Sequence, residues 1–386
     1  MISAIGNNVQ EAYANLSNAK SGIGKINHLT TRYKDEFVAG EIKLSNKDLM
    51  DLIQFKSPAL NRTSMLGIAA ASEALKHSGI DLNDGMRTGL ISSTTVAGMC
   101  KTELFYKEMV DKAMHLEVLD AHDCGESTEE IADYLGVKDF VTTISTACSS
   151  AANAVMLGSR MIKQGMLDRV IVGGVDALSK FTFNGFNTLM ILDKEWCKPF
   201  DENRKGLNLG EAGAFIVIES EASLKKRNGK ALATVAGYAN ANDAYHQTAS
   251  SPDGFGATMA IQQALKMSGL TPSQIDYINM HGTGTPNNDQ SESKATVNVF
   301  GGNVPKFSST KAYTGHTLAP AAGVEAVISI LSIQNNQIFP NLNFTTPISE
   351  FGLVPVTEVT THQMNHVLSN SFGFGGNCSS LIFSRA

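Results

Sequence analysis

Residues 140–155 read Phe-Val-Thr-Thr-Ile-Ser-Thr-Ala-Cys-Ser-Ser-Ala-Ala-Asn-Ala-Val. The first five residues favour a strand, and the alanine-rich part from residue 151 favours a helix. Cys148 lies on the turn between them, close to the amino end of the helix. The free N–H groups and the positive end of the helix dipole favour a thiolate there, and the thiolate is the nucleophilic form of cysteine. The pattern therefore predicts a nucleophile on a strand-to-helix turn.

Strand-like and helix-like segments alternate along the whole chain. Apolar, β-rich runs occur at 89–93, 170–175, 214–219, 275–280 and 379–383, and helical patterns occur at 61–78, 151–164, 258–268 and 320–334. No Pro/Ser-rich linker divides them, and the 34 glycines suit many tight turns. This alternation predicts an α/β fold with largely buried sheets.

A short pattern occurs twice. Residues 146–155 and residues 314–324 each place a reactive side chain, Cys148 or His316, at the start of a helix rich in small residues. Such a repeated pattern would result if one half of the chain were a duplicate of the other. Small residues at a helix start also serve close packing, so both interpretations stay open at this point.

The bulk composition limits the classes of protein. The chain has 386 residues, 42% of them apolar, which is ample for a large core or two halves. A net charge of −6 gives no overall basic field, so nucleic acid is not expected as a partner. No signal-peptide pattern and no apolar run of the roughly 20 residues that span a membrane occur, and the expected location is the cytoplasm.

The five cysteines are scattered and form no CxxC pair, which favours reduced thiols over a disulfide framework. Cys100, Cys124 and His122 could be combined into a metal site, but their spacing matches no familiar ligand pattern. We therefore predict one special cysteine among inert ones, and no metal.

Two histidines and a lysine accompany the cysteine. His281 opens His-Gly-Thr-Gly-Thr-Pro directly after a strand-like run, where sites gather in α/β folds. His316 precedes a helix and follows Lys311 by five residues. Either histidine alone would be interpreted as a hydrogen-bonded residue of a turn or of the core. Together with Cys148, they predict covalent acyl catalysis.

A glycine-rich segment near the carboxyl end, Asn-Ser-Phe-Gly-Phe-Gly-Gly-Asn at 370–377, has the flexibility to aim backbone N–H groups at a developing oxyanion. A phosphate-binding loop is the competing interpretation. It is disfavoured because no Lys-Ser/Thr follows and no helix pattern begins there. Cys378, just after the glycines, is expected to be a packed thiol.

Taken in order, these motifs resemble the β-ketoacyl-[acyl-carrier-protein] synthases of the Cys-His-His branch, which are KAS I/II-like ketosynthases of the thiolase-like superfamily. The matching segments are Thr146-Ala-Cys-Ser-Ser, Pro199-Phe-Asp-x-x-Arg-x-Gly, Leu209-Gly-Glu, His281-Gly-Thr-Gly-Thr-Pro, Ser309-Thr-Lys-x-x-x-Gly-His and Asn370-Ser-Phe-Gly-Phe-Gly-Gly. The resemblance implies an α/β thiolase-like fold of two duplicated βαβαβ-based halves, 1–240 and 241–386, in a five-layered α-β-α-β-α core. It also implies a homodimer.

The resemblance further implies a decarboxylative condensation without a bound cofactor, on substrates carried by the phosphopantetheine of acyl carrier protein. Cys148 would take the acyl chain, and the carbanion from malonyl carrier protein would then attack it. His281 and His316 would stabilise the enolate oxygen, and Lys311 would hold the histidines in place. The N–H groups of Cys148 and Phe374 would form the oxyanion hole, with the Phe374 ring as an aromatic gate.

Other positions match the family by motif or by alignment alone. Motif matches imply that Thr283 and Thr285 contact pantetheine and that Asp289 and Glu292 are acidic side chains near the lysine. Alignment places Val96 and Phe186 along the acyl tunnel, although ordinary core positions explain them equally well. Lys56 and Arg62 lie where relatives present basic side chains to the carrier protein, or they are solvated surface charges.

The chain departs from the family pattern in three places. It begins at Met1-Ile-Ser-Ala-Ile-Gly and is expected to lack the first strand of relatives, which would leave a central sheet position empty. Lys205 replaces a usual acidic residue, and Ala212 replaces a glycine. Residues 93–130 also differ from the family pattern. Because this region shapes the acyl tunnel and the dimer interface in the family, the preferred length of the acyl chain stays open.

The leading hypothesis is a condensing enzyme of fatty acid elongation. The runner-up is a ketosynthase of a polyketide or aryl-polyene pathway, working as a heterodimer with a chain-length factor. A third hypothesis, that the chain is itself a chain-length factor, is disfavoured because such subunits typically lack the cysteine. A degradative thiolase would carry a second cysteine before its final glycines, where this chain has Asn370-Ser-Phe-Gly-Phe.

Overall fold

The computed structural model describes residues 1–57 and 60–386 and contains two five-stranded sheets. The strands of the first sheet, in spatial order, are β1 (Ile2–Ser3), β7 (Ala212–Glu219), β6 (Arg169–Asp176), β4 (Thr88–Ser93) and β5 (Phe140–Ile144). Those of the second are β8 (Thr234–Asn242), β14 (Asn377–Ser384), β13 (His366–Gly373), β9 (Tyr277–Asn279) and β10 (Lys306–Ser308). Two small ribbons pair β2 (Gly24–Lys25) with β3 (Val38–Ala39) and β11 (Gln337–Ile338) with β12 (Thr360–Thr361).

The two sheets have the same topology. When the strands of each sheet are numbered along the chain, both have the order 1-5-4-2-3. In both, the first and fifth strands and the fifth and fourth pair antiparallel, whereas the remaining neighbours are parallel. The duplication that the sequence echo left open is thus present in the fold.

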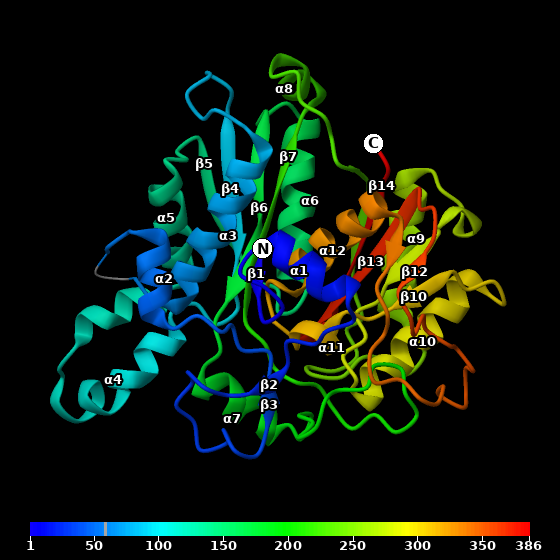
Figure 1. Cartoon of the computed structure of the whole chain (residues 1–386), viewed down its shortest axis with the longest axis horizontal. Helices are drawn as coiled ribbons and strands as arrows, with labels where there is room; N and C mark the ends of the chain where they lie inside the picture. Colours follow the sequence, from blue (N-terminus) through cyan, green and yellow to red (C-terminus); the bar gives the residue numbers. More distant parts are fainter. Residues whose placement is uncertain (58–59) are drawn as a thin grey trace.

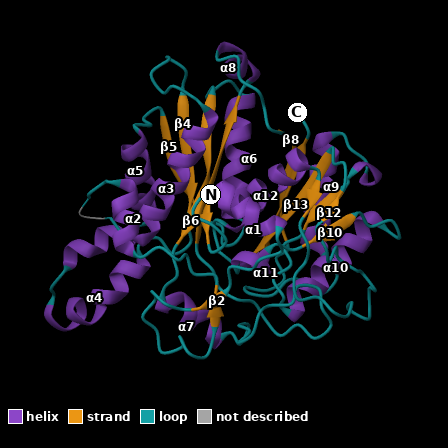
Figure 2. Cartoon of the chain, viewed as in Figure 1, coloured by secondary structure: helices purple, strands orange, loops and turns teal. Residues whose placement is uncertain are grey.

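Helices form three layers around the two sheets (Figures 1 and 2). α3 (Arg62–Ser78) and α5 (Cys124–Leu135) cover the outer face of the first sheet, α6 (Ser150–Lys163) and α12 (Ala321–Asn335) lie between the sheets, and α9 (Phe255–Ser268) and α10 (Pro286–Phe300) lie on the far side of the second. The remaining helical elements are α1 (Val9–Ser17), α2 (Asn46–Ile53), α4 (Met99–Lys112), η1 (Leu116–His122), α7 (Lys180–Thr188), α8 (Glu221–Lys226), η2 (Pro272–Gln274), α11 (Lys311–Thr314) and η3 (Phe374–Gly376). The predicted five-layered thiolase-like architecture is confirmed.

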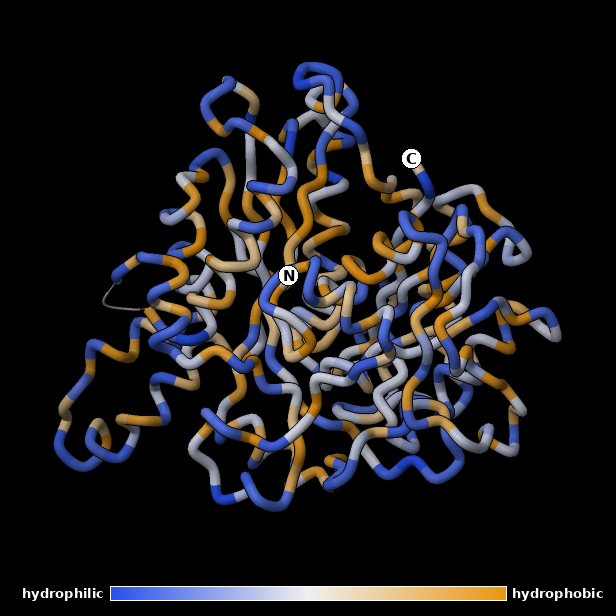
Figure 3. The backbone as a smooth tube through the Cα atoms, viewed as in Figure 1, coloured by the Kyte–Doolittle hydropathy of each residue, from blue (hydrophilic) through white to orange (hydrophobic). Residues whose placement is uncertain are grey.

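The apolar core runs through the middle layer. α12 is apolar around nearly its whole circumference, as expected for a helix enclosed on all sides. Ala322 of α12, Ala151 of α6 and Phe383 of β14 belong to one buried cluster that spans both halves. Figure 3 shows the apolar residues gathered along the strands and this central layer. The two halves therefore share a core, which places the helix starts of α6 and α12 against each other.

The expected empty position in the sheet is a wrong prediction. Ile2 and Ser3 form the short strand β1, which pairs with Gly213 and Ala212 of β7. β1 lies at the edge of the sheet, next to the last strand of its half, so no central position depends on it. Met1 is buried as well. The counterpart of β1 in the second half is β8. It is longer than β1 and pairs with β14 along most of its length.

Most predicted elements are present with small shifts. The helix expected at 258–268 begins at Phe255, and the strand expected at 275–280 is shorter, Tyr277–Asn279. The boundary expected near residue 240 falls inside β8, which pairs in the second sheet. We propose instead to divide the halves between the end of β7 and residue 234. Within the described residues, no helix is both long and apolar enough to cross a membrane.

Candidate active site

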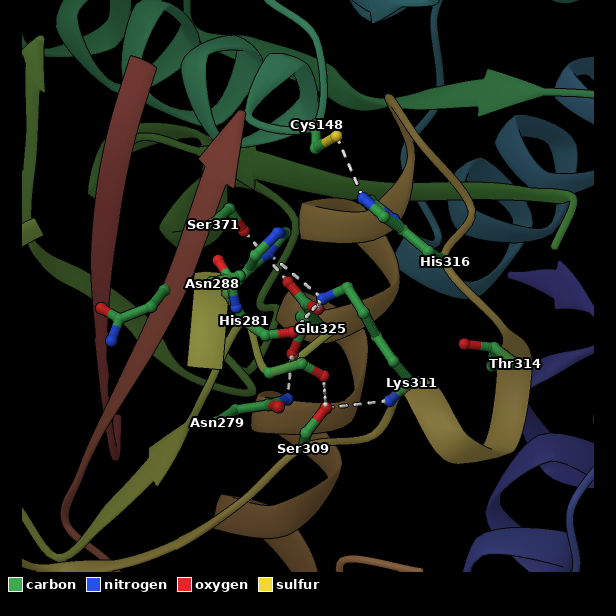
Figure 4. Close-up of polar contacts among 12 residues, drawn as sticks. Cys148, Asn279, His281, Asn288, Ser309, Lys311, Thr314, His316, Glu325 and Ser371 are labelled. Atoms are coloured by element: carbon green, nitrogen blue, oxygen red, sulfur yellow. Dashed lines mark hydrogen bonds and ion pairs between the residues drawn. The ribbon is translucent and has the colours of Figure 1, made fainter. Parts of the chain in front are cut away.

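Cys148 lies on the turn between β5 and α6, as predicted. Ala147, just before it, has a φ of +52°, a conformation that alanine adopts only at some energetic cost. The turn is held by hydrogen bonds within itself, among them one from the Thr146 N–H to Ser150 Oγ at 2.8 Å. Cys148 is buried, with 5% of its surface exposed. The local strain and the bonds that hold it aim the sulfur toward the second half of the molecule (Figure 4).

His316 comes from the second half and meets the sulfur directly. Its Nε2 lies 3.0 Å from Cys148 Sγ, and its Nδ1 lies 3.3 Å from the N–H of Leu318. A backbone N–H can only donate, so Nδ1 is the acceptor and the ring proton of the neutral imidazole is on Nε2. His316 is therefore oriented to donate a hydrogen bond to the sulfur.

His281 is held by Lys311. The Lys311 Nζ donates to the His281 carbonyl oxygen at 2.5 Å and lies 3.2 Å from His281 Nδ1. Because an ammonium group only donates, the proton of neutral His281 is also on Nε2. The two imidazole rings are 5.4 Å apart and nearly perpendicular. Burial, with the charge of Lys311, lowers the pKa of both histidines, so both are neutral donors.

Glu325 completes this group and was not predicted from the sequence. It lies on α12, forms an ion pair with Lys311, and accepts a hydrogen bond from Ser371 Oγ at 3.0 Å. Both members of the ion pair are almost fully buried. A signal was available, since Glu325 is the only charged residue in the fifteen-residue helix. A buried charge in an apolar helix needs a partner, and Lys311 is that partner.

Asp289 and Glu292, the acidic residues expected near the lysine, bind backbone groups of the loop that carries His281. Glu292 accepts hydrogen bonds from the backbone N–H groups of His281, at 2.9 Å, and Gly282, at 2.8 Å. Asp289 accepts from the N–H of Gly284, at 3.2 Å, and from that of Phe200, at 2.8 Å. The two carboxyl groups thus fix the loop that carries His281, while the carboxylate paired with the lysine is that of Glu325.

The Cys148 sulfur also meets the glycine-rich segment. The backbone N–H of Phe374 is hydrogen-bonded to Cys148 and, with Lys311, lowers the pKa of its thiol, but burial has the larger effect and raises it to about 12. The expected preference for the thiolate is therefore wrong for this enclosed site, because the loss of water around the sulfur outweighs the effect of the helix start. The thiol is the resting form.

Two residues aligned to the acyl tunnel lie near this segment. The ring of Phe374 stacks on that of Phe186, with centroids 5.6 Å apart and planes inclined by 19°. Phe186 and Val96 border one apolar cluster that also contains Leu318. Phe186 is thus linked to the cysteine through Phe374, and Val96 borders the same apolar cluster as Phe186.

The remaining predicted residues differ in their surroundings. Thr283 and Thr285 are buried and hydrogen-bond to each other at 2.9 Å. Lys56 is exposed, whereas Arg62 is buried and forms an ion pair with Glu211. Arg62 is therefore wrongly predicted as a carrier-protein contact, since its charge is used inside the first half. In the described part of the chain, no three His, Cys, Asp or Glu side chains are grouped to hold a metal ion.

A duplicated thiolase-type fold with one cysteine and two histidines at the junction of its halves defines the class of condensing enzymes. Residues 1–223 match the model of the beta-ketoacyl synthase N-terminal domain, and residues 232–345 match that of the C-terminal domain. The chain belongs to the beta-ketoacyl synthase family, as the sequence motifs indicated.

Curated relatives match along the whole chain. The chain is 32% identical to 3-oxoacyl-[acyl-carrier-protein] synthase 2 of Staphylococcus aureus (strain N315), covering 100% of this chain and 96% of the relative. It is 33% identical to the protein of the same name from Vibrio cholerae, covering 100% and 97%.

Solved structures give the same fold. The ishigamide ketosynthase/chain length factor matches with a TM-score of 0.94 and 29% identity, covering 100% of this chain and 97% of that one. The ketosynthase ApeO in complex with its chain length factor ApeC, from Xenorhabdus doucetiae, matches with a TM-score of 0.84 and 29% identity, covering 100% and 96%.

Proposed function

We propose that this protein catalyses the decarboxylative condensation of an acyl thioester, held on Cys148, with malonyl-[acyl-carrier-protein]. The product is a β-ketoacyl-[acyl-carrier-protein], and the leading pathway is fatty acid elongation. One observation carries the proposal: the Cys148 sulfur is 3.0 Å from a histidine Nε2, with a second neutral histidine beside it. A nucleophile next to two proton donors suits acyl transfer followed by enolate formation.

In the first half-reaction, the sulfur of Cys148 attacks the carbonyl carbon of the acyl thioester. The N–H groups of Cys148 and Phe374 hold the oxyanion of the tetrahedral intermediate. The bond between the carbonyl carbon and the pantetheine sulfur then breaks, and the proton lost by Cys148 ends on that departing thiol.

In the second half-reaction, the malonyl group loses carbon dioxide, and the electron pair of the broken C–C bond forms an enolate. The Nε2–H groups of His281 and His316 hold the enolate oxygen. The carbanion attacks the acyl carbonyl, a new C–C bond forms, and the bond to Cys148 breaks. The sulfur leaves as a thiolate and takes up one proton from solvent, which restores the thiol. No redox change occurs, so the chain's own residues suffice without a cofactor.

Lys311 and Glu325 keep His281 in its donor form. The ammonium occupies the lone-pair side of the ring, at 3.2 Å from Nδ1, and its charge disfavours protonation of both histidines. Glu325 balances that charge inside the protein. Val96 and Phe186 are proposed to line the acyl tunnel, with Phe374 as its gate. Thr283 and Thr285 are proposed to contact pantetheine, and exposed Lys56 to contact the acidic carrier protein.

A second candidate is a ketosynthase that pairs with a chain-length factor in polyketide or aryl-polyene synthesis. The structural likeness to ketosynthases solved with such partners favours it. α4 projects from the body (Figure 1), and with η1 it exposes a row of apolar side chains: Leu104, Tyr106, Val110, Met114, Leu116 and Leu119. A surface of this kind suits a subunit contact, in a homodimer or in a heterodimer. The expected cytoplasmic location is part of either proposal.

The test is product analysis of the purified protein alone. It receives saturated acyl carrier proteins of several chain lengths and malonyl carrier protein, and intact-mass spectrometry follows the enzyme and the carrier products. Elongated β-ketoacyl products support the fatty acid proposal and map the tunnel. Acylation of Cys148 without elongation until a second ketosynthase-like subunit is added supports the second candidate. A protein that is not acylated under either condition contradicts both.

A further inference from the structure

Asp176 is a buried carboxylate that the mechanism above does not use. It is the last residue of β6 and is 0% exposed. Its oxygens accept hydrogen bonds from Thr94 Oγ1 at 2.5 Å, from Thr95 Oγ1 at 2.6 Å and N–H at 3.0 Å, and from the Val96 N–H at 3.2 Å. A further bond, at 2.9 Å, comes from the N–H of Ala319 in the second half. One side chain thus joins the loop after β4 to the loop that follows His316.

Ala319 connects this carboxylate to both reacting groups. Its N–H donates to Asp176 and its carbonyl oxygen accepts from the Ala151 N–H at 3.2 Å. Ala151 lies three residues after Cys148 on α6, and Ala319 lies three residues after His316. A short path of hydrogen bonds through Ala151 and Ala319 therefore links the segment that carries Cys148 to the segment that carries His316. This path ends on Asp176.

The loop from 316 to 320 would not hold this shape unaided. Leu318 has a φ of +64°, a strained conformation for leucine, and its N–H binds His316 Nδ1. The loop is also pressed against β6, since a Cβ placed on Gly174 would lie 3.2 Å from the Cα of Pro320. A strained loop persists only where neighbouring groups hold it, and the Asp176 bond to Ala319 is such a hold.

We propose that Asp176 is a positioning residue: it fixes the His316 loop of one half against the Cys148 helix of the other and thereby sets the contact between Nε2 and Sγ. The inference rests on the proposed roles of Cys148 and His316. The same carboxylate binds the Val96 N–H, so the acyl-tunnel side of the site is fixed to the same anchor.

An effect of the Asp176 charge and an effect of its hydrogen bonds predict opposite changes in the ease of forming the Cys148 thiolate when Asp176 is replaced. The inference is therefore testable. The groups that bear electrostatically on the Cys148 thiol are Lys311, which lowers its pKa, and Asp176 and Glu325, which raise it. If Asp176 acted only through its charge, Asp176→Asn would make the thiolate easier to form. If it positions His316, the same change removes a hydrogen-bond donor from the sulfur and makes the thiolate harder to form.

The experiment measures alkylation of Cys148 by iodoacetamide across pH, with peptide mass spectrometry to separate Cys148 from the other cysteines. We expect Asp176→Asn to slow alkylation by about 10- to 100-fold at each pH at which the protein stays folded. Thr95→Val is the matched control, because it removes one bond to the same carboxylate and keeps the bond from Ala319. It should leave the alkylation rate unchanged.

A double-mutant cycle gives the second readout. In a His316→Ala background, Asp176→Asn should slow alkylation no further, because its effect passes through His316. An alkylation rate that stays the same or rises in Asp176→Asn, or an equal slowing in both backgrounds, overturns the proposal. If Asp176→Asn does not fold, Asp176→Glu, which moves the carboxylate by one methylene, takes its place with the same expectations. Failure of the proposed function is seen separately, as loss of the acyl adduct from Cys148 in the unmodified protein.

Discussion

The two halves share one topology but divide the chemistry between them. Cys148 follows the third strand of the first half, β5, and precedes its middle-layer helix, while His316 follows the third strand of the second half, β10, and precedes α12. The two residues thus occupy equivalent places, and they meet where the two helix starts face each other. The topology is repeated, whereas the side chains at its junction differ.

The fourth strands show the same division. β6 ends in Asp176, a carboxylate that binds loops together, whereas β13 ends in Gly373, where an added Cβ would lie 3.1 Å from the Cys148 N–H nitrogen. In the proposed mechanism, the first half therefore supplies the nucleophile, Cys148, and its anchor, Asp176. The second supplies His281, Lys311, His316 and Glu325, and lets its backbone approach the sulfur. Equivalent positions in one fold can serve opposite purposes, and the variants below test that division.

The largest effect is expected from removing the one reactive group of the first half. Cys148→Ala should abolish the acyl-enzyme and lower condensation by at least about 10³-fold, while decarboxylation of malonyl carrier protein can persist through the second half. Intact-mass spectrometry and carbon dioxide release measure the two reactions. Cys378→Ala, which changes another buried thiol, is the control and should acylate normally. An acyl adduct that survives in Cys148→Ala would show that the nucleophile lies elsewhere.

Removing a histidine of the second half should separate the two half-reactions. His281→Ala and His316→Ala are each expected to lower condensation by about 10²- to 10³-fold, since a preorganised donor to the enolate oxygen is lost. Acylation of Cys148 should fall less in both. Burst acylation and steady-state condensation, measured on the same preparations, give the two rates. Equal loss of both rates would contradict the division of roles between the halves.

Each half contains a buried ion pair, and the comparison predicts different consequences. Glu325→Gln leaves the Lys311 ammonium without its anion, and we expect a loss of about 3–5 kcal/mol in the free energy of unfolding together with slower condensation. Arg62→Met breaks the pair with Glu211 in the first half and should cost similar stability with little change in the rate per folded molecule. Urea unfolding and condensation assays measure both. Equal losses of condensation activity in Glu325→Gln and Arg62→Met would contradict the predicted difference between the two ion pairs.

The smallest effect concerns the first strand of each half. β8 pairs with β14 along most of its length, whereas β1 pairs with only two residues of β7. Adding about six β-forming residues before Met1 should extend that pairing and raise the melting temperature by about 2–4 °C. Differential scanning fluorimetry measures the shift, and a Gly/Ser extension of equal length is the control. If both extensions behave alike, the edge of β7 gains nothing from a partner.

The sequence motifs predicted the fold and the reactive group well, because each motif combines a strand end, a small-residue turn and a reactive side chain. Cys148, His281, His316 and Lys311 are brought together as expected. Glu325 was missed, although a lone charge in an apolar helix was a signal for it. The inward direction of Arg62 and the high pKa of the thiol were beyond reach. They depend on which side chains face each other across distant segments and on how much water remains, and neither is visible in local patterns.

The equivalence of Cys148 and His316 has a consequence for symmetry. In a twofold pair of identical half-proteins, any residue at the axis faces a copy of itself, so a cysteine there would meet a cysteine. A cysteine facing a histidine requires two copies whose sequences differ. Because one chain joins the two copies through the segment between β7 and β8, they differ in sequence and still remain paired.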